Sequence, residues 1–174
     1  MLVTGATGFV GSRLIPALLS RGHDVVALVR DADGYAPPDG VSVVEGDLLE
    51  PDTLPPAFEL DGETVDAAYY LVHSMDGGPG YEERDRNWAT NFAAAASDAG
   101  IERIVYLGGL GEDREELSEH LRSRREVERI LGEGDPALTT LRAAIIIGAG
   151  SASFEVIAGL ARRLPVMVTP KWVD

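Results

Sequence analysis

The first eleven residues, MLVTGATGFVG, constrain the fold of this chain more than any other stretch. A short apolar segment leads directly into glycines at positions 5, 8 and 11, and an amphipathic segment follows. Gly5 permits a sharp exit from a strand, Gly8 lets the backbone approach a diphosphate closely, and Gly11 lets a helix pack near the sheet. The free N–H groups at the start of such a helix attract anions. The pattern therefore predicts a turn that binds the diphosphate of a dinucleotide.

Strand-like and helix-like segments alternate along the rest of the chain. We expect strands at 24–30, 41–44, 65–72, 103–107 and 138–147, and helices at 10–21, 81–99, 115–131 and 153–164, with a short helix from about residue 51. Pro16 lies inside the first of these helices and should kink or loosen it. The alternation predicts an α/β fold, a Rossmann-type doubly wound parallel sheet with helices on both faces.

The length of 174 residues fits one NAD(P)-binding domain, 1–174, in which residues from about 150 begin a C-terminal substrate portion that we expect to be truncated. No apolar stretch is long enough to span a membrane, and the first residues do not resemble a secretion signal. We therefore expect a cytoplasmic protein without a membrane span. Because the chain has no cysteine, disulfides, thiolate catalysis and cysteine-ligated metal sites are excluded.

The net charge of −14, from 29 acidic and 15 basic residues, argues against nucleic acid or an anionic membrane as a partner. Only Lys171 among the basic residues is a lysine. Two explanations stay open: adaptation to a salt-rich cytoplasm, where screening suppresses repulsion, or a merely acidic protein from a GC-rich genome. The sequence does not indicate an oligomeric state.

The end of the second expected strand bears on the choice of cofactor. Arg30 occupies the position nearest the adenosine ribose, where an arginine can pair with a 2′-phosphate. We therefore expect NADP, with NAD as the alternative because Asp31 stands beside it. Asp47 and Leu48, which follow the third strand, are expected to contact the adenine.

Several segments resemble a known superfamily. Residues 4–11 and 46–48 resemble the extended and atypical short-chain dehydrogenases/reductases, and residues 70–75, 87–91 and 120–124 resemble their atypical, NmrA-like or NAD(P)H-binding branch. This branch includes proteins described as nucleoside-diphosphate-sugar epimerases and relatives of a complex I accessory subunit. The resemblance implies that the turn contacts the cofactor through Gly5, Thr7, Gly8, Phe9 and Val10, and that its ribose and nicotinamide lie near Leu71, Val72 and His73.

The chain departs from this superfamily where active members carry a Tyr, a Lys four residues later, and a Ser or Thr after the fifth strand. Those positions hold His120, Arg124 and the hydroxyl-free segment 108–110. At about 100° per residue, His120 and Arg124 share one arc of their helix with apolar residues, so we expect both to face a polar cavity. Arg124 would hold a ribose or a phosphate.

His120 would shuttle a proton near pH 7, or serve as a structural histidine, and His73 is a weaker catalytic candidate. Asn87 and Asn91 are expected to hydrogen-bond strand ends near the cofactor.

The leading hypothesis is an NAD(P)-dependent oxidoreductase or epimerase-like enzyme, acting on a small molecule that the sequence does not identify. The alternatives are a non-catalytic NADP(H)-binding redox sensor of the NmrA type, or an accessory subunit of a respiratory complex.

Overall fold

The computed structural model of the chain describes residues 1–74, 80–110, 118–144 and 146–163. The chain divides into two compact units, Met1–Ala143 and Ala144–Asp174. The first contains the sheet and its covering helices, and the described part of the second contains helix α4 (Ala152–Arg163). Within the described ranges, none of the helices has both the length and the apolar character needed to cross a bilayer.

A six-stranded sheet forms the centre of the first unit, with the strands in the order β3-β2-β1-β6-β7-β8. All five strand pairs are parallel. The strands are β1 (Leu2–Thr4), β2 (Val25–Val29), β3 (Val41–Glu45), β6 (Ala67–Tyr70), β7 (Arg103–Gly109) and β8 (Ala137–Ala143). The order reverses between β1 and β6, and doubly wound sheets usually bind their ligand at the carboxyl ends of the strands at such a reversal.

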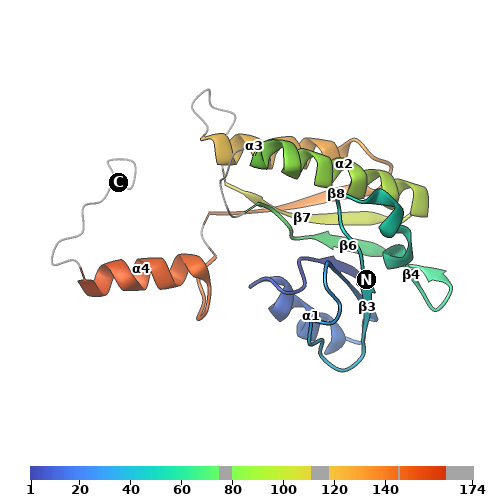
Figure 1. Ribbon diagram of the computed structural model, residues 1–174, viewed down its shortest axis with the longest axis horizontal. Helices are drawn as coiled ribbons and strands as arrows, with labels where there is room; N and C mark the ends of the chain where they lie inside the picture. The colour runs from blue at the N-terminus through green and yellow to red at the C-terminus, as the bar shows by residue number, and fades with distance from the viewer. Residues whose placement is uncertain (75–79, 111–117, 145, 164–174) are drawn as a thin grey trace. The chain divides into compact units, whose positions relative to one another are not determined.

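Helices cover both faces of the sheet, as the sequence predicts (Figure 1). Helix α1 (Gly11–Leu19) lies on one face, whereas α2 (Tyr81–Ala99) and α3 (Glu119–Gly132) lie on the other. Alternate residues of β2 supply the two cores: Val26 and Leu28 pack on the side of α2, and Val25, Ala27 and Val29 pack on the side of α1. Burial on both faces explains why β2 is continuously apolar.

The observed elements differ from the expected ones mainly at their ends. Helix α2 has the expected bounds. It ends at Ala99 and is capped by Gly100, whose φ of 71° is left-handed. Helix α3 begins after Ser118, whose side chain accepts the Leu121 N–H, and expected residues 115–117 lie outside the described residues. Helix α1 runs from Gly11 to Leu19, within the expected range of 10–21. The exposed Pro16 lies inside it and does not end it.

A short helix starts at Pro51, as expected, but it is the 3₁₀ helix η1 (Pro51–Thr53), and a second 3₁₀ helix, η2 (Pro55–Phe58), follows it. The prolines lack the N–H donors that a longer α-helix needs. Two expected strands have the wrong bounds. The strand expected at 65–72 covers only 67–70 and is preceded by an unpredicted antiparallel hairpin, β4 (Glu59–Leu60) and β5 (Glu63–Thr64). The last strand ends at Ala143, because its parallel partner β7 ends at Gly109.

Gly11 is the position at which the packing of α1 is most sensitive to a side chain. A Cβ there would lie 2.2 Å from the carbonyl oxygen of Gly5 and 2.9 Å from the Cα of Ala6. We therefore expect Gly11→Ala to push α1 away from the end of β1 and to destabilise the sheet unit by about 1–3 kcal/mol, as overpacking typically does. Thermal unfolding measures the effect. Gly159→Ala in α4, where nothing lies within 4 Å, is the matched control and should leave the melting temperature of the sheet unit unchanged.

Candidate functional site

The turn between β1 and α1 has the geometry of an anion-binding bend. The chain leaves β1 at Gly5 with a φ of 68°, and the Gly8 N–H donates to the Gly5 carbonyl oxygen at 3.0 Å. Thr7 and Gly8 are exposed. No side chain of the described residues caps the start of α1. The N–H groups of Ser12 and Arg13 donate to the Gly8 and Val10 carbonyl oxygens, so the backbone N–H groups that an anion can accept from are those just before them, at residues 9–11.

The side chain of Thr4 ties this turn to the neighbouring strand. Its hydroxyl donates to the Tyr69 carbonyl oxygen and accepts the Leu71 N–H, both at 3.1 Å. The backbone of Leu71 consequently passes so close to Gly5 that a Cβ on Gly5 would lie 3.3 Å from the Leu71 carbonyl group. Leu71, Val72 and His73 are half-buried at this edge of the sheet. The structure thus brings the predicted segment 71–73 next to the glycine turn.

The segment after β3 is held in place by polar contacts. The carboxylate of Asp47 accepts the Leu49 N–H at 2.8 Å, and the Asp47 N–H donates to the Thr53 hydroxyl at 3.0 Å. Leu48 is buried, and its carbonyl oxygen accepts from the Asn91 amide of α2 at 2.7 Å. Asn91 therefore bonds to the segment that follows β3, whereas the exposed Asn87 makes no side-chain hydrogen bond to another described residue.

Arg30 stands directly after β2 and is exposed. No hydrogen bond or ion pair joins its guanidinium to another residue of the described chain. The neighbouring acids are already engaged with the backbone: Asp31 accepts the Gly34 N–H at 3.0 Å, and Glu45 accepts the Ala32 N–H at 2.8 Å. The guanidinium of Arg30 can therefore donate to a ligand at the carboxyl end of β2.

Helix α3 carries His120 and Arg124 to the carboxyl end of β7, where they meet His73. The Arg124 guanidinium donates to the Leu107 carbonyl oxygen at 2.9 Å and to the Nε2 of His120 at 3.4 Å. The rings of His73 and His120 meet edge-on with centroids 6.3 Å apart. These three residues, which we call the His–Arg cluster, come from two segments far apart in the sequence and lie beside one another at the edge of the sheet.

The missing hydroxyl after β7 has a steric explanation. A Cβ on Gly109 would lie 3.0 Å from the Leu121 side chain and 3.4 Å from the Cδ of Arg124. A serine at position 109 would therefore crowd the Leu121 side chain and contact the stem of Arg124. The two nearby buried tyrosines do not replace that hydroxyl, because Tyr70 is 1% exposed and Tyr106 donates its hydroxyl to the Arg124 carbonyl oxygen at 3.2 Å.

Both histidines of the cluster have a lowered pKa. Burial, followed by the positive charge of Arg124 and the proximity of His120, lowers the pKa of His73 to about 4, although Asp85 acts in the opposite direction. Burial and then Arg124 lower the pKa of the more exposed His120. Both rings are therefore neutral near pH 7. Because the Nε2 of His120 accepts from Arg124, its Nδ1 carries the proton.

Asp85 is the residue of this region that the sequence analysis did not identify. Its carboxylate is 5% exposed and accepts hydrogen bonds from Ser74 and Ser123, which flank His73 and Arg124 in the sequence. The sequence pattern could have indicated it, because Asp85 lies at helical spacing from apolar residues and shares the buried face of α2 with Ala89, Phe92, Ala93 and Ala96. A charged residue within an apolar stripe is the same pattern that singled out His120 and Arg124.

The chain is similar to known proteins over most of its length. The model of a family described as NAD(P)H-binding matches residues 5–147. A putative dihydroflavonol 4-reductase of Synechocystis sp. is 34% identical over 140 residues, which are 75% of this chain and 39% of that protein. The photosystem II assembly factor Ycf39 of Synechocystis sp. is 30% identical over 111 residues, which are 62% of this chain and 32% of that protein.

Among solved structures, the triphenylmethane reductase of Citrobacter sp. complexed with NADP(H) has a TM-score of 0.71 and 25% identity. The match covers 92% of this chain and 53% of that one. The chain thus spans between about a third and about half of the length of these three proteins.

The lowered pKa of His73 predicts a loss of stability in mild acid. Between its folded value of about 4 and its ordinary value near 6.5, the unfolded chain binds more protons than the folded one, so stability falls as the pH decreases through this window. We expect His73→Gln to reduce the slope of the unfolding free energy between pH 6.5 and 5, measured by denaturant titration at constant salt. Above pH 7 the unfolding free energies of the wild type and of His73→Gln should depend on pH in the same way. A slope below pH 6.5 that is the same in both proteins would contradict the prediction.

Proposed function

The chain belongs to the NAD(P)H-binding family, and on that premise we propose that the bend between β1 and α1 holds the diphosphate of the cofactor. The uncapped start of α1 and the close approach of Gly5 to Leu71 fit a diphosphate, since they leave backbone N–H groups open and exclude side chains. The residues proposed to contact it in this bend are Gly5, Thr7, Gly8, Phe9 and Val10.

The remaining cofactor contacts follow the same edge of the sheet. Asp47 and Leu48 would contact the adenine, because Asn91 fixes this segment from α2 while Asp47 uses one carboxylate oxygen for Leu49 and keeps the other open. The segment 71–73 would border the ribose and nicotinamide. We propose NADP over NAD, because Arg30 is exposed and uncommitted whereas Asp31 is bound to the Gly34 N–H.

The reaction that the His–Arg cluster supports best is reduction or oxidation at a carbonyl or carbinol carbon, as in an oxidoreductase or an epimerase-like enzyme. When bound, the nicotinamide supplies or accepts the hydride. The observation that carries this proposal is the neutral His120, with its Nδ1–H as donor, beside the permanent charge of Arg124. A neutral imidazole and an adjacent cation can stabilise negative charge that develops on a substrate oxygen. Because His120 is exposed, solvent can supply the proton that this oxygen finally takes.

A second candidate is a dinucleotide-binding protein without turnover, either a redox sensor or an accessory subunit of a larger complex. Two observations favour it. No hydroxyl side chain is present at 108–110, and one relative is an assembly factor. In this case the cluster would respond to the oxidation state of the nicotinamide without carrying out chemistry.

The cofactor preference predicts a selective effect of Arg30. Arg30→Ala should weaken NADP binding by about 1.5–3 kcal/mol, because a charged hydrogen bond to the 2′-phosphate is lost, and should leave NAD binding nearly unchanged. Isothermal titration with both nucleotides measures this difference. Arg21→Ala is the matched control, since Arg21 is an exposed arginine before β2 and so lies near the opposite end of that strand. Equal losses for the two nucleotides would overturn the preference for NADP.

The enzyme hypothesis predicts that NADPH is oxidised when a panel of ketones, aldehydes and quinones is added, which is followed by the loss of nicotinamide absorbance. His120→Ala should slow this oxidation by about 100-fold or more, because a preorganised donor to the substrate oxygen is removed, while the affinity for NADPH is kept. His23→Ala, at an exposed turn before β2, should have no effect. Tight binding of NADPH without turnover across the panel would instead favour the sensor.

A further inference from the structure

We propose that Asp85 is a positioning residue that locks the His–Arg cluster together by joining the segment after β6 to helix α3. The inference rests on the proposed function, because it assigns Asp85 a role in the reaction of that cluster.

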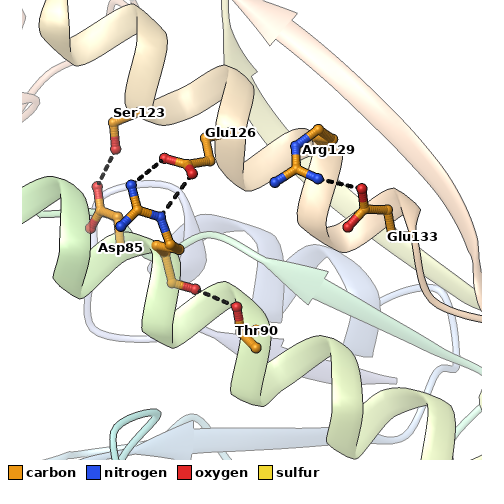
Figure 2. A network of polar contacts seen from close by, with 7 residues as sticks. Asp85, Thr90, Ser123, Glu126, Arg129 and Glu133 are labelled. Carbon is orange, nitrogen blue, oxygen red and sulfur yellow. Dashed lines mark hydrogen bonds and ion pairs between the residues drawn. The ribbon is translucent and has the colours of Figure 1, made fainter.

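The carboxylate of Asp85 bridges the segment after β6 and helix α3. Its Oδ1 accepts the Ser74 N–H at 2.9 Å and the Ser74 hydroxyl at 2.7 Å, and its Oδ2 accepts the Ser123 hydroxyl at 3.2 Å. Figure 2 shows Asp85 on α2 and Ser123 on the neighbouring helix with the dashed contact between them. Three donors to one carboxylate suit an ionised group, which can only accept hydrogen bonds.

Each serine is the immediate neighbour of a cluster residue. Ser74 follows His73, and Ser123 precedes Arg124. Because one peptide unit separates each pair, fixing the two serines on one carboxylate restricts where His73 and Arg124 can lie. Arg124 in turn donates to His120, so the contact between the two imidazole rings depends on the same anchor.

Packing alone does not account for a carboxylate at this position. Its neighbours on the same face of α2, Ala89, Phe92 and Ala96, are apolar and fully buried. Burying a charge costs free energy that an apolar residue would not. The cation nearest to it in the hydrogen-bond network, Arg84, reaches Asp85 only through the Ser74 hydroxyl, to which its Nε donates at 3.0 Å. An outward ion pair, Arg86 with Glu126 at 2.8 Å, already joins α2 to α3 (Figure 2).

The charge of Asp85 also acts on the histidines. The titratable and charged groups that affect His73 are Asp85 from α2 and His120 and Arg124 from α3, and those that affect His120 are Arg124 and Asp85. Asp85 is the one anion among these groups. Its negative charge acts to raise the pKa of both histidines, which partly offsets the lowering by burial and by Arg124.

Asp85→Asn tests the inference, because the amide keeps the oxygen that accepts from Ser74 while its NH₂ can donate to the Ser123 hydroxyl after that hydroxyl rotates. The shape is preserved and the charge is lost. We expect the pKa of His73 and of His120, followed by NMR of the ring protons without any substrate, to fall below the wild-type values. The NADPH affinity should stay within about threefold. With a substrate from the carbonyl panel, kcat should fall by about tenfold and the acid limb of its pH profile should move to lower pH.

Two further variants complete the test. Asp98→Asn, at an exposed position of the same helix, should leave the titrations and kcat unchanged. Ser123→Ala breaks the tie to α3 without changing any charge, so it should lower kcat while the NADPH affinity persists, and it provides the readout if Asp85→Asn does not fold. Histidine titrations and kcat that match the wild type in both Asp85→Asn and Ser123→Ala would overturn the proposal. Shifted titrations in a protein that turns nothing over would support the positioning of the His–Arg cluster by Asp85, while contradicting both the enzyme hypothesis and the role of Asp85 in a reaction.

Discussion

The close backbone contact at the start of α1 is the constraint on which the rest of the site depends. Gly11 sits so near the Gly5 carbonyl group that not even a methyl group fits between them, and Gly5 in turn lies against the backbone of Leu71. The helix therefore begins at the carboxyl edge of β1 and directs its N–H groups to the point where the strand order reverses. An anion bound there would lie next to the backbone of Leu71, which follows β6.

Helix α2 organises that edge from the opposite face of the sheet. Asn91 holds the segment after β3 through the Leu48 carbonyl group, and Asp85, six residues earlier, holds Ser74 after β6 and Ser123 on α3. Buried polar groups of this kind are stable only when their hydrogen bonds are satisfied, so they specify one arrangement of the loops and not merely a compact one. The adenine end and the nicotinamide end of the proposed cofactor site consequently share one rigid support.

The departure from the Tyr, Lys and Ser pattern of the superfamily is a linked set of changes. Gly109 leaves room for the stem of Arg124, Arg124 donates to Leu107 and to His120, and its charge contributes to keeping both histidines neutral. The cluster thus has a permanent cation and a neutral imidazole at the positions where active members carry a lysine and a tyrosine.

The sequence by itself determined the alternating strands and helices, the class of sheet and the glycine bend, because each depends on local periodicity or on the backbone freedom of single residues. It also brought forward His120 and Arg124, whose polarity stands out within an apolar stripe. Only the tertiary structure decided that Asp85 joins Ser74 to Ser123, since these residues are 11 and 38 positions away from it. The neutral state of the two histidines was likewise decided by folding, because burial and the nearness of Arg124 exist only once β6, β7 and α3 have come together.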